Sequence, residues 1–161
     1  MKSDRLWAPW RIKYVEVKRQ KKCIFCKSIK SKGRDYVIAK TKYSICLLNI
    51  FPYNNGHAMV SPRRHIGQIQ QLNQAEILDI FKTLNSVKKL LDKVLKPDGY
   101  NIGINISGDA GAGITGHLHM HIVPRWKGDT NFMPVLYGTK VISQSLDELY
   151  KKLKNAKSRT D

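Results

Sequence analysis

The longest run of periodically spaced apolar residues predicts a helix between Asn73 and Pro97. Apolar side chains recur there every three or four residues, the spacing that gathers them on one face of a helix. Asn73 and Glu76 form a capping box at its start, and Pro97 and Gly99 end it. We expect the whole apolar stripe to lie in the core: Ile77, Ile80, Phe81, Leu84, Val87, Leu90, Leu91, Val94 and Leu95.

Shorter apolar runs on both sides of this helix predict strands. A short strand is expected within residues 36–39, and residues 44–50 are densely apolar, as in a buried strand. Residues 57–61 form the next strand, and the turn residues between the two, 52–56, predict a hairpin. Residues 100–106 alternate strictly between apolar and small or polar side chains, which predicts another strand.

The last predicted strand, residues 117–126, alternates histidine with apolar side chains until Pro124 ends the run. Successive side chains of a strand point to opposite faces, so the imidazoles are expected to stand in a row on one face. The row consists of His117, His119 and His121. The residues expected to face the core are Leu118, Met120 and Ile122.

Such a row of imidazoles suits an extended anionic ligand. Neighbouring members have Cα atoms about 6.7 Å apart and the outer two about 13 Å apart. One zinc ion, which holds imidazole nitrogen at about 2 Å, therefore cannot take all three. A metal site that uses two of them and a solvent-facing row with no function are the alternatives.

A short helix is expected near the C-terminus, beginning at Ser145, which makes a second capping box with Glu148. Its apolar side consists of Leu146, Leu149, Tyr150 and Leu153. Antiparallel strands with separate helices, one long and one short, make an α+β fold. We expect a single domain over 1–161, divided into an irregular N-terminal arm, 1–35, a core, 36–126, and a C-terminal loop and helix, 127–161.

The formal net charge of +17 indicates an anionic partner. Nucleic acid, a membrane surface and small phosphorylated substrates all fit, and composition does not separate them. The lysine-rich segments 18–22 and 151–154 are typical of solvated faces, and no RNA-binding or helix-turn-helix signature accompanies them. Nucleic-acid binding therefore stays open but is not favoured.

The sequence shows no pattern typical of a membrane span, a signal peptide or a disulfide framework. No apolar run approaches the roughly 20 residues of a membrane-spanning helix, and residues 1–4 lead into no signal-peptide core. Three cysteines do not make a disulfide framework, and the pair Cys23 and Cys26 is typical of a zinc half-site or a redox dithiol. We expect a cytoplasmic protein without a membrane partner. Cys46, inside an apolar strand, is most simply a core residue.

A glycine-rich loop, residues 107–116, leads into the histidine strand. It lacks the Gly-Lys-Ser/Thr ending of a P-loop and connects strand to strand, so it is neither a Walker motif nor a dinucleotide fingerprint. Its backbone N–H groups can still approach an anion closely, which would make it a phosphate cradle. A flexible hairpin connection is the alternative.

Together, the histidine row, the strand at 57–61 and the glycine loop resemble the histidine-triad family of nucleotide hydrolases and transferases. The defining motif, His-φ-His-φ-His-φ-φ with φ apolar, is present at 117–123, and the resemblance covers roughly 36–126. Segments 6–10 and 124–132 look like the branch that contains bacterial diadenosine tetraphosphate phosphorylases and hydrolases. The resemblance implies an antiparallel sheet that extends across a homodimer, and chemistry on the α-phosphate of a nucleotide.

The resemblance also implies catalytic roles. His119 matches the nucleophile, which would form a nucleotidyl-histidine that water or inorganic phosphate then cleaves. His121 matches the residue that contacts phosphate and the scissile oxygen, and His57 matches a fourth histidine that supports the strand opposite the triad. The implied substrate is a dinucleoside polyphosphate, preferably diadenosine tetraphosphate. Adenosine phosphoramidate is the nearest rival within the same mechanism, and a nucleotide- or nucleic-acid-binding module is the rival outside it.

The implied substrate contacts come from the hairpin and from the glycine loop. Asn49 falls where the family binds the ribose, and Asn105 lies near its phosphate-binding asparagine. Gly113 stands where several relatives carry Gln or Ser, so backbone N–H groups or Thr115 would have to assist the leaving group. The positions where the base is usually held, with core packing as the alternative, are Leu47 and Met59.

Metal-containing relatives imply a structural zinc site. They use a Cys-x-x-Cys pair, a histidine just past the proline-ended strand and the first triad histidine. These positions map onto Cys23, Cys26, His65 and His117. The ion would pin the N-terminal arm to the sheet, and His117 would orient the site without catalysing. A reduced dithiol with His65 on the surface and a catalytic zinc are the alternatives.

Overall fold

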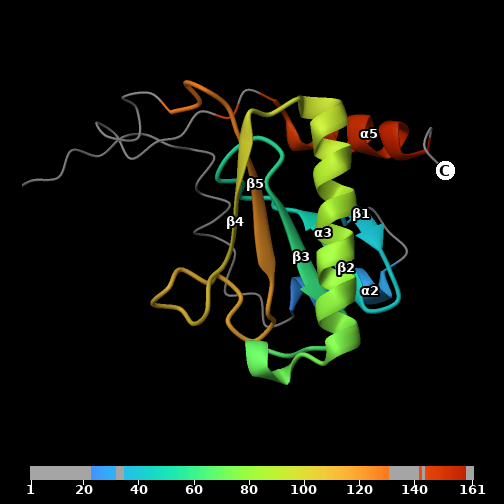
Figure 1. Ribbon diagram of the computed structural model, residues 1–161, viewed down its shortest axis with the longest axis vertical. Coiled ribbons are helices and arrows are strands. Elements are labelled where there is room, and N and C mark those ends of the chain that lie inside the picture. Colours follow the sequence, from blue (N-terminus) through green and yellow to red (C-terminus); the bar gives the residue numbers. More distant parts are fainter. Residues whose placement is uncertain (1–22, 32–34, 131–141, 143, 159–161) are drawn as a thin grey trace, which may run out of the picture.

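A five-stranded antiparallel sheet forms the centre of the computed structural model, which describes residues 23–31, 35–130, 142 and 144–158 (Figure 1). The strands lie in the order β1-β2-β3-β5-β4. They are β1 (Val37–Lys40), β2 (Ser44–Leu48), β3 (Ala58–Pro62), β4 (Gly99–Ile104) and β5 (Met120–Arg125). The helices of the described part are α2 (Ile24–Lys30), the 3-10 helix η2 (Ile69–Gln71), α3 (Gln74–Leu95) and α5 (Leu146–Lys157). The predicted α+β class is confirmed.

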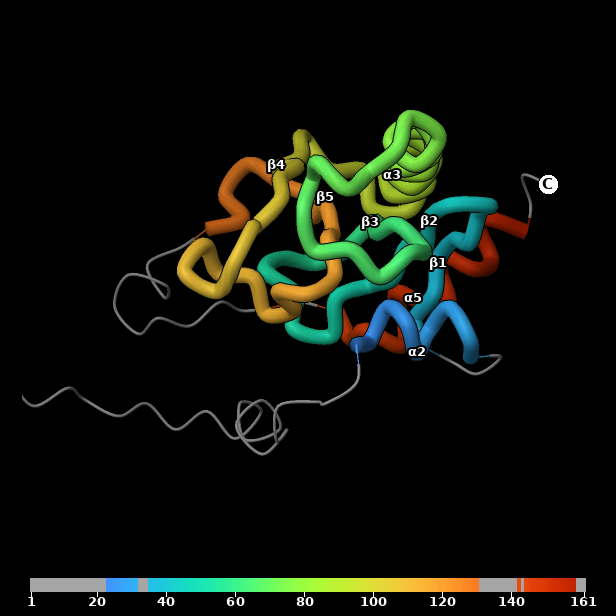
Figure 2. The backbone as a smooth tube through the Cα atoms, turned by 90° about the horizontal axis from the view of Figure 1, so that it is seen from below, coloured from blue at the N-terminus to red at the C-terminus, as the bar shows by residue number. Residues whose placement is uncertain are grey.

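Helices α3 and α2 lie on opposite sides of the sheet (Figure 2). Every residue of β2 is buried because both of its faces are covered. Cys46 and Leu48 join the larger core cluster with α3 and α5, whereas Ile45 and Leu47 join a smaller cluster with Phe25 of α2. None of the described helices is both long and apolar enough to cross a bilayer.

The predicted hairpin is present, with β2 and β3 paired so that Leu47 lies opposite Met59. Gly56 in the connecting turn has φ +77°, a conformation that favours glycine. A Cβ at this position would also meet Cδ1 of Leu95 at 2.5 Å and Cγ of Pro124 at 3.0 Å. The turn that positions His57 therefore requires glycine.

Both predicted helices form where expected. The capping box between Asn73 and Glu76 is complete in α3, and Ser145 caps α5 by accepting a hydrogen bond from the backbone N–H of Glu148 at 3.3 Å. The prediction for α3 was wrong at two positions, because Ile77 and Phe81 are 41% and 55% exposed. Both side chains lie at one margin of the apolar stripe and face solvent.

The two exposed residues lie on the flank of α3 next to the edge strand β4. On that flank, the hydroxyl of Tyr100 in β4 lies 2.7 Å from the carboxylate of Asp92 and 3.4 Å from the carbonyl oxygen of Lys88. Phe81 and Ile77 lie 7 and 11 residues before Lys88 in the same helix. At 3.6 residues per turn, these spacings keep all four on one side of the helix. An apolar strip thus faces solvent beside the sheet edge.

Three further differences concern the ends of elements. The arm was expected to be irregular, but α2 forms directly after Cys23, because Phe25 packs fully buried against the sheet. The strand predicted over 100–106 ends at Ile104. The strand predicted over 117–126 begins only at Met120, since the N–H of Leu118 bonds to Ile66 O at 2.6 Å outside the sheet ladder. Segments 6–10 and 18–22 lie outside the described residues.

Candidate active site

Four imidazoles are buried together on the side of the sheet covered by α2. His57, His117, His119 and His121 are exposed by only 1%, 0%, 4% and 7%. The ring of Phe25 lies 5.0 Å from that of His117 and 5.3 Å from that of His119, measured between centroids. The alternative of a solvent-facing histidine row is therefore excluded, and the row is part of an enclosed polar cluster.

A chain of hydrogen bonds fixes the tautomers of His57 and His121. The backbone N–H of Tyr53 donates to Nδ1 of His57 at 3.0 Å, so this nitrogen carries the lone pair and Nε2 carries the proton. His57 Nε2–H then donates to Nδ1 of His121 at 2.8 Å. The proton of a neutral His121 must therefore sit on Nε2. That atom is buried and has no hydrogen-bond partner among the described residues, so it can donate to a ligand.

His119 has the opposite tautomer. Its Nδ1 lies 2.8 Å from the carbonyl oxygen of His117, which can only accept, so Nδ1 carries the proton. The lone pair of a neutral ring is then on Nε2. The rings of His119 and His121 are 4.9 Å apart between centroids. A nitrogen lone pair and a hydrogen-bond donor thus come from neighbouring rings, that of His119 directly before β5 and that of His121 within it.

Burial keeps these rings neutral. Desolvation lowers the pKa of His119, although its bond to the carbonyl of His117 opposes this. Desolvation and the nearby imidazole of His119 lower the pKa of His121 to about 4. Desolvation, followed by the nearby rings of His121 and His119, lowers the pKa of His57 to about 3. At neutral pH the cluster carries no charge, as nucleophilic attack by an imidazole requires.

The predicted substrate-binding residues of the hairpin differ in how they lie relative to the histidine cluster. Asn49 lies beside His57, with its side-chain amide nitrogen 3.3 Å from His57 Nδ1 and its backbone N–H bonded to His57 O at 2.9 Å. Leu47 and Met59 are only 2% and 4% exposed, and they pack with Phe25 in the smaller core cluster. The structure thus uses these two apolar residues for packing, and base contact stays a prediction.

The glycine loop is closed by its own backbone, through Gly111 N–H to Gly108 O at 2.9 Å and Ala112 N–H to Ser107 O at 3.1 Å. The side-chain amide of Asn105 lies against Gly111. Gly113 and Thr115 are exposed, and within the described ranges no hydrogen bond joins either of them to the histidines. The structure therefore does not bring these two predicted residues into the cluster, and their part in binding stays a prediction.

The predicted metal ligands, in contrast, come together. The ligand atoms of Cys23, Cys26, His65 and His117 all lie within 4.8 Å of one another. Nδ1 of His117 is 3.1 Å from Sγ of Cys23 and 3.6 Å from Sγ of Cys26, and Nδ1 of His65 is 3.3 Å from Sγ of Cys26. A tetrahedral zinc with its usual bond lengths needs ligand atoms about 3.3–3.8 Å apart. The tetrad therefore has the size and the donor set of a closed zinc site.

The tautomer of His117 is the one that a zinc ligand requires. Its Nε2 lies 2.8 Å from the carbonyl oxygen of Pro62, so the proton is on Nε2 and the lone pair of Nδ1 faces the two thiols. A metal-binding imidazole usually donates its other N–H to a carbonyl in this way. The carbonyl oxygen of His117 accepts the Nδ1–H of His119, so His117 connects the tetrad to the next histidine of the row.

Two contributors were missed from the sequence. Tyr53 sets the tautomer of His57 through its backbone, and its ring lies 4.4 Å from the ring of His57 and 5.6 Å from that of His121. Phe25 covers His117 and His119. A backbone donor has no signature in residue type, and only the position of Phe25 inside the cysteine motif pointed to the cluster. A cavity of about 420 Å³ lies away from the histidine cluster, at the turn formed by Trp126–Asp129, and none of the four clustered histidines lines it.

The comparisons with known proteins agree with this geometry. Residues 30–128 match a family model described as the HIT domain. The chain is 34% identical over 153 residues to a Mycobacterium tuberculosis protein named AP-4-A phosphorylase, a match that covers 89% of this chain and 78% of that protein. A solved structure described as a Zn-bound histidine triad family protein from Mycobacterium smegmatis has a TM-score of 0.69 at 23% identity, and covers 86% of this chain and 95% of that chain. The latter similarity shows the fold.

Two proteins of Schizosaccharomyces pombe are also similar. One is named asymmetrical bis(5'-nucleosyl)-tetraphosphatase and is 34% identical over 101 residues, which covers 63% of this chain and 55% of that protein. The other is named adenosine 5'-monophosphoramidase hnt1 and is 35% identical over 103 residues, which covers 64% of this chain and 74% of that protein. The named relatives thus include one phosphorylase and two hydrolases.

The hydrogen bonds predict the tautomers directly. In a chain labelled with ¹⁵N-histidine, two-bond correlation NMR at neutral pH should show His119 as the Nδ1–H tautomer and His57 and His121 as Nε2–H tautomers. Because burial lowers the last two pKa values to about 3 and 4, both rings should remain neutral as the pH falls from 8 to 5. An Nε2–H proton on His119, or protonation of His57 near pH 6.5, would contradict the site as described.

Proposed function

Since the chain belongs to the histidine-triad (HIT) family, we propose that it cleaves dinucleoside polyphosphates through a covalent nucleotidyl-His119 intermediate, with diadenosine tetraphosphate preferred. One observation carries the proposal: a buried, neutral His119 has its Nδ1–H bonded to a backbone carbonyl, and its ring lies 4.9 Å between centroids from that of His121, whose Nε2–H has no partner among the described residues. The names of the phosphorylase and tetraphosphatase relatives support the substrate class.

The proposed reaction has two displacements at the same phosphorus. Nε2 of His119 attacks the α-phosphorus, and the bond from phosphorus to the bridging oxygen breaks, so the rest of the polyphosphate leaves as an anion. The Nε2–H of His121 donates a hydrogen bond to the phosphate or the scissile oxygen, and His57 holds that ring in the required tautomer. Water or inorganic phosphate then attacks the same phosphorus, and the P–N bond breaks to regenerate His119. Two easier steps replace one difficult displacement.

The substrate contacts are part of this proposal. We propose that Asn49, whose side-chain amide lies 3.3 Å from Nδ1 of His57, binds the ribose hydroxyls, and that Asn105 with the backbone of the glycine loop binds phosphate. The leaving group would be assisted by backbone N–H groups or by Thr115, because Gly113 offers no side chain. Adenosine phosphoramidate is a second candidate substrate for the same nucleophile, and the name of the monophosphoramidase relative favours it.

Substitution of the nucleophile tests the mechanism. His119→Ala or His119→Asn should reduce the turnover of diadenosine tetraphosphate by roughly 10³-fold or more, because the covalent step is lost. Equilibrium binding of a nucleotide should persist in both variants, which serves as the control for folding. Retention of more than a few per cent of the activity would remove His119 from the mechanism.

The products identify the second nucleophile and the atom attacked. Attack at the α-phosphorus should give AMP and ATP in water, and ADP and ATP when inorganic phosphate is the acceptor. Two molecules of ADP without phosphate would mean symmetrical cleavage and would contradict the proposed attack. Adenosine phosphoramidate, tested in parallel, should be the poorer substrate, and a preference for it would reassign the substrate.

We also propose that Cys23, Cys26, His65 and His117 hold a structural zinc ion. The spacing and donor set of the tetrad support this, as does the likeness to a Zn-bound structure. When bound, the ion would supply a cross-link between the arm and the sheet, which holds Phe25 over His117 and His119. All three cysteines are free thiols, which supports the cytoplasm as the compartment.

Metal removal distinguishes a structural ion from a catalytic one. A strong chelator should lower the midpoint of thermal unfolding, and added Zn²⁺ should restore it, because the binding energy of the ion contributes to folding. The Cys23→Ser variant should show the low midpoint with or without chelator. If the chelator stopped turnover at once while the midpoint stayed unchanged, the ion would be catalytic.

The exposed strip beside β4 supports the proposed homodimer. Strand β4 is an edge of the sheet, and Ile102 on it is 47% exposed. Side chains alternate along a strand, so Ile102 lies on the same face as Tyr100, which contacts α3. Together with Ile77 and Phe81 of α3, it forms an apolar strip next to unpaired strand backbone. Such an edge is a template for pairing with a second chain.

Charge on this strip should prevent dimerisation. Ile102→Glu should reduce the mass measured by light scattering from twice the chain mass to one chain mass, 18.5 kDa, because a buried carboxylate would be left unpaired at the interface. Ile69→Glu is the matched control, since Ile69 lies on η2 and is 45% exposed. A wild-type protein that is already monomeric, or equal effects of the two variants, would contradict this interface.

A further inference from the structure

Arg64, the residue before the ligand His65, makes three short hydrogen bonds to the region where α3 begins. Its Nε and Nη2 donate to the two carboxylate oxygens of Glu76 at 2.6 and 2.7 Å, and Nη2 also donates to the carbonyl of Gln71 at 2.7 Å. A bidentate guanidinium–carboxylate pair fixes orientation as well as distance. The position of residue 64 is therefore tied to the first turn of α3.

Glu76 is a rigid partner for this clamp. Its side chain is 2% exposed, and its Oε2 also accepts the backbone N–H of Asn73 at 3.0 Å in the capping box. The bond from Arg64 lowers the pKa of Glu76 below its ordinary value, against the effect of burial, so the carboxylate is ionised. The carboxylate belongs to a helix of 22 residues, the longest element of the described chain. The clamp thus anchors Arg64 to a rigid part of the fold.

His65 depends on its backbone for its position more than His117 does. His117 is fully buried, and its Nε2–H is held by the carbonyl of Pro62. His65 is exposed, and within the described ranges no hydrogen bond joins its ring to any group outside the tetrad. The backbone around it is held on one side by the clamp of Arg64 and on the other by Ile66 O, which accepts the N–H of Leu118 at 2.6 Å.

We propose that Arg64 is a positioning residue of the metal site, which preorganises His65 so that metal affinity depends on the Arg64–Glu76 clamp. The inference rests on the zinc site of the proposed function. Outer-shell groups that orient a metal ligand typically change affinity by about 10- to 100-fold. The side chain of Arg64 is 54% exposed but that of Glu76 is only 2% exposed, so loss of Arg64 also leaves a buried carboxylate without its partner, and folding stability must be measured together with metal affinity.

The experiment compares metal affinity with folding stability in full-length, metal-stripped protein. Co²⁺ is titrated first, because tetrahedral cobalt bound to thiolates absorbs in the visible range, and Zn²⁺ is then added in competition. Arg64→Gln should weaken binding of both ions by roughly 10- to 100-fold and should reduce the intensity of the tetrahedral cobalt bands. His65→Ala sets the limit for loss of the ligand itself.

The matched control is Arg125→Gln. Arg125 makes a bidentate pair with Asp129 at 2.6 and 2.9 Å, and its side chain is 42% exposed, but it lies at the opposite end of the sheet from the tetrad. Its loss should leave the cobalt spectrum and both affinities within about twofold of wild type, whatever it does to unfolding. Such a contrast separates positioning of the ligand from general support of the fold.

A second variant keeps the test decisive if Arg64→Gln does not fold. Glu76→Gln retains the side-chain acceptor of the capping box and removes only the charge of the clamp, so it should weaken metal binding in the same direction but less. Wild-type affinity in a folded Arg64→Gln or Glu76→Gln protein, or an equal loss in Arg125→Gln, would overturn the role of Arg64. A wild-type chain that binds neither cobalt nor zinc would overturn the metal site itself, while turnover through His119 could still be measured.

Discussion

The hydrogen bond from His119 Nδ1–H to the carbonyl oxygen of His117 is the contact on which the site depends. It decides which nitrogen of His119 carries the lone pair, and hence which atom would attack phosphorus in the proposed reaction. The other contacts hold that carbonyl in place. His117 is fixed at Nε2 by Pro62, and its Nδ1 points toward Cys23 and Cys26. Because one residue serves the nucleophile through its backbone and the tetrad through its side chain, a displacement of the tetrad would displace the nucleophile.

Burial of four imidazoles is compatible with a stable fold because almost every ring nitrogen has a partner. An unpaired buried polar group costs about 1–3 kcal/mol, whereas a paired one is close to neutral. His57 and His117 are held at both nitrogens, and His119 at one. The two exceptions in the described structure are Nε2 of His119, which carries a lone pair, and Nε2 of His121, a donor that is buried. An orphan donor in an otherwise satisfied cluster is what a site for an anionic ligand requires, since the ligand supplies the missing acceptor.

The sequence predicted well where a local rule decides the structure. The start of α3 follows from its capping box, and the strands follow from apolar runs and alternation, although the alternating segments are longer than the strands that form, because these patterns depend on neighbouring residues alone. The tetrad was predicted only through the resemblance, since nothing local connects His65 with Cys26. What failed was decided by tertiary packing. Phe25 makes α2 a buried helix too short to show periodicity, whereas Ile77 and Phe81 fit a core stripe but face solvent. The tautomer of His57 depends on a backbone N–H, which every residue except proline carries.

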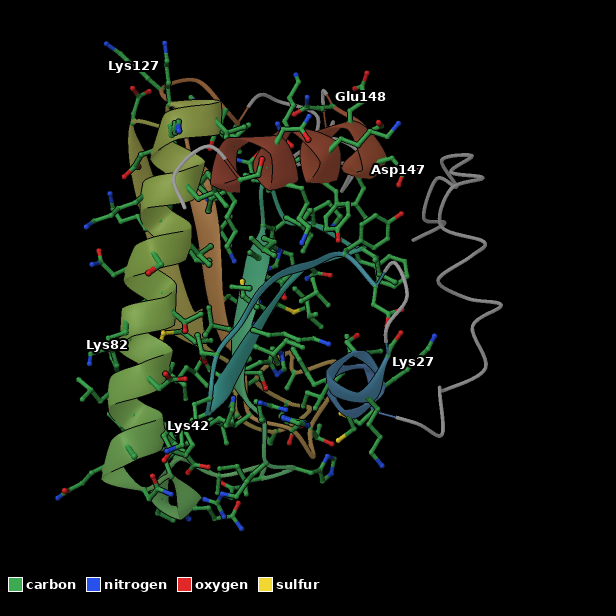
Figure 3. All side chains as sticks on the ribbon, turned by 90° about the vertical axis from the view of Figure 1, so that its right-hand side faces the viewer. Lys27, Lys42, Lys82, Lys127, Asp147 and Glu148 are labelled. Atoms are coloured by element: carbon green, nitrogen blue, oxygen red, sulfur yellow. The ribbon has the colours of Figure 1, made fainter. Side chains whose placement is uncertain are left out.

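The net charge of +17 arises because 29 lysines and arginines outnumber 12 acidic residues, some of which are paired inside the fold. Glu76 and Asp79 are bonded within the fold, and so is Asp129, whereas lysines such as Lys27 and Lys82 point into solvent (Figure 3). Three of the twelve acidic side chains are thus used internally, whereas others, such as Asp147 and Glu148 of α5, lie on the surface together with the more numerous lysines. A field of this kind attracts any polyanion and raises its encounter rate, in a way that salt screens. It does not distinguish one polyanion from another. In the proposed reaction, selectivity would therefore come from the neutral, enclosed histidine cluster, where hydrogen-bond geometry and not net charge would determine which phosphorus is attacked.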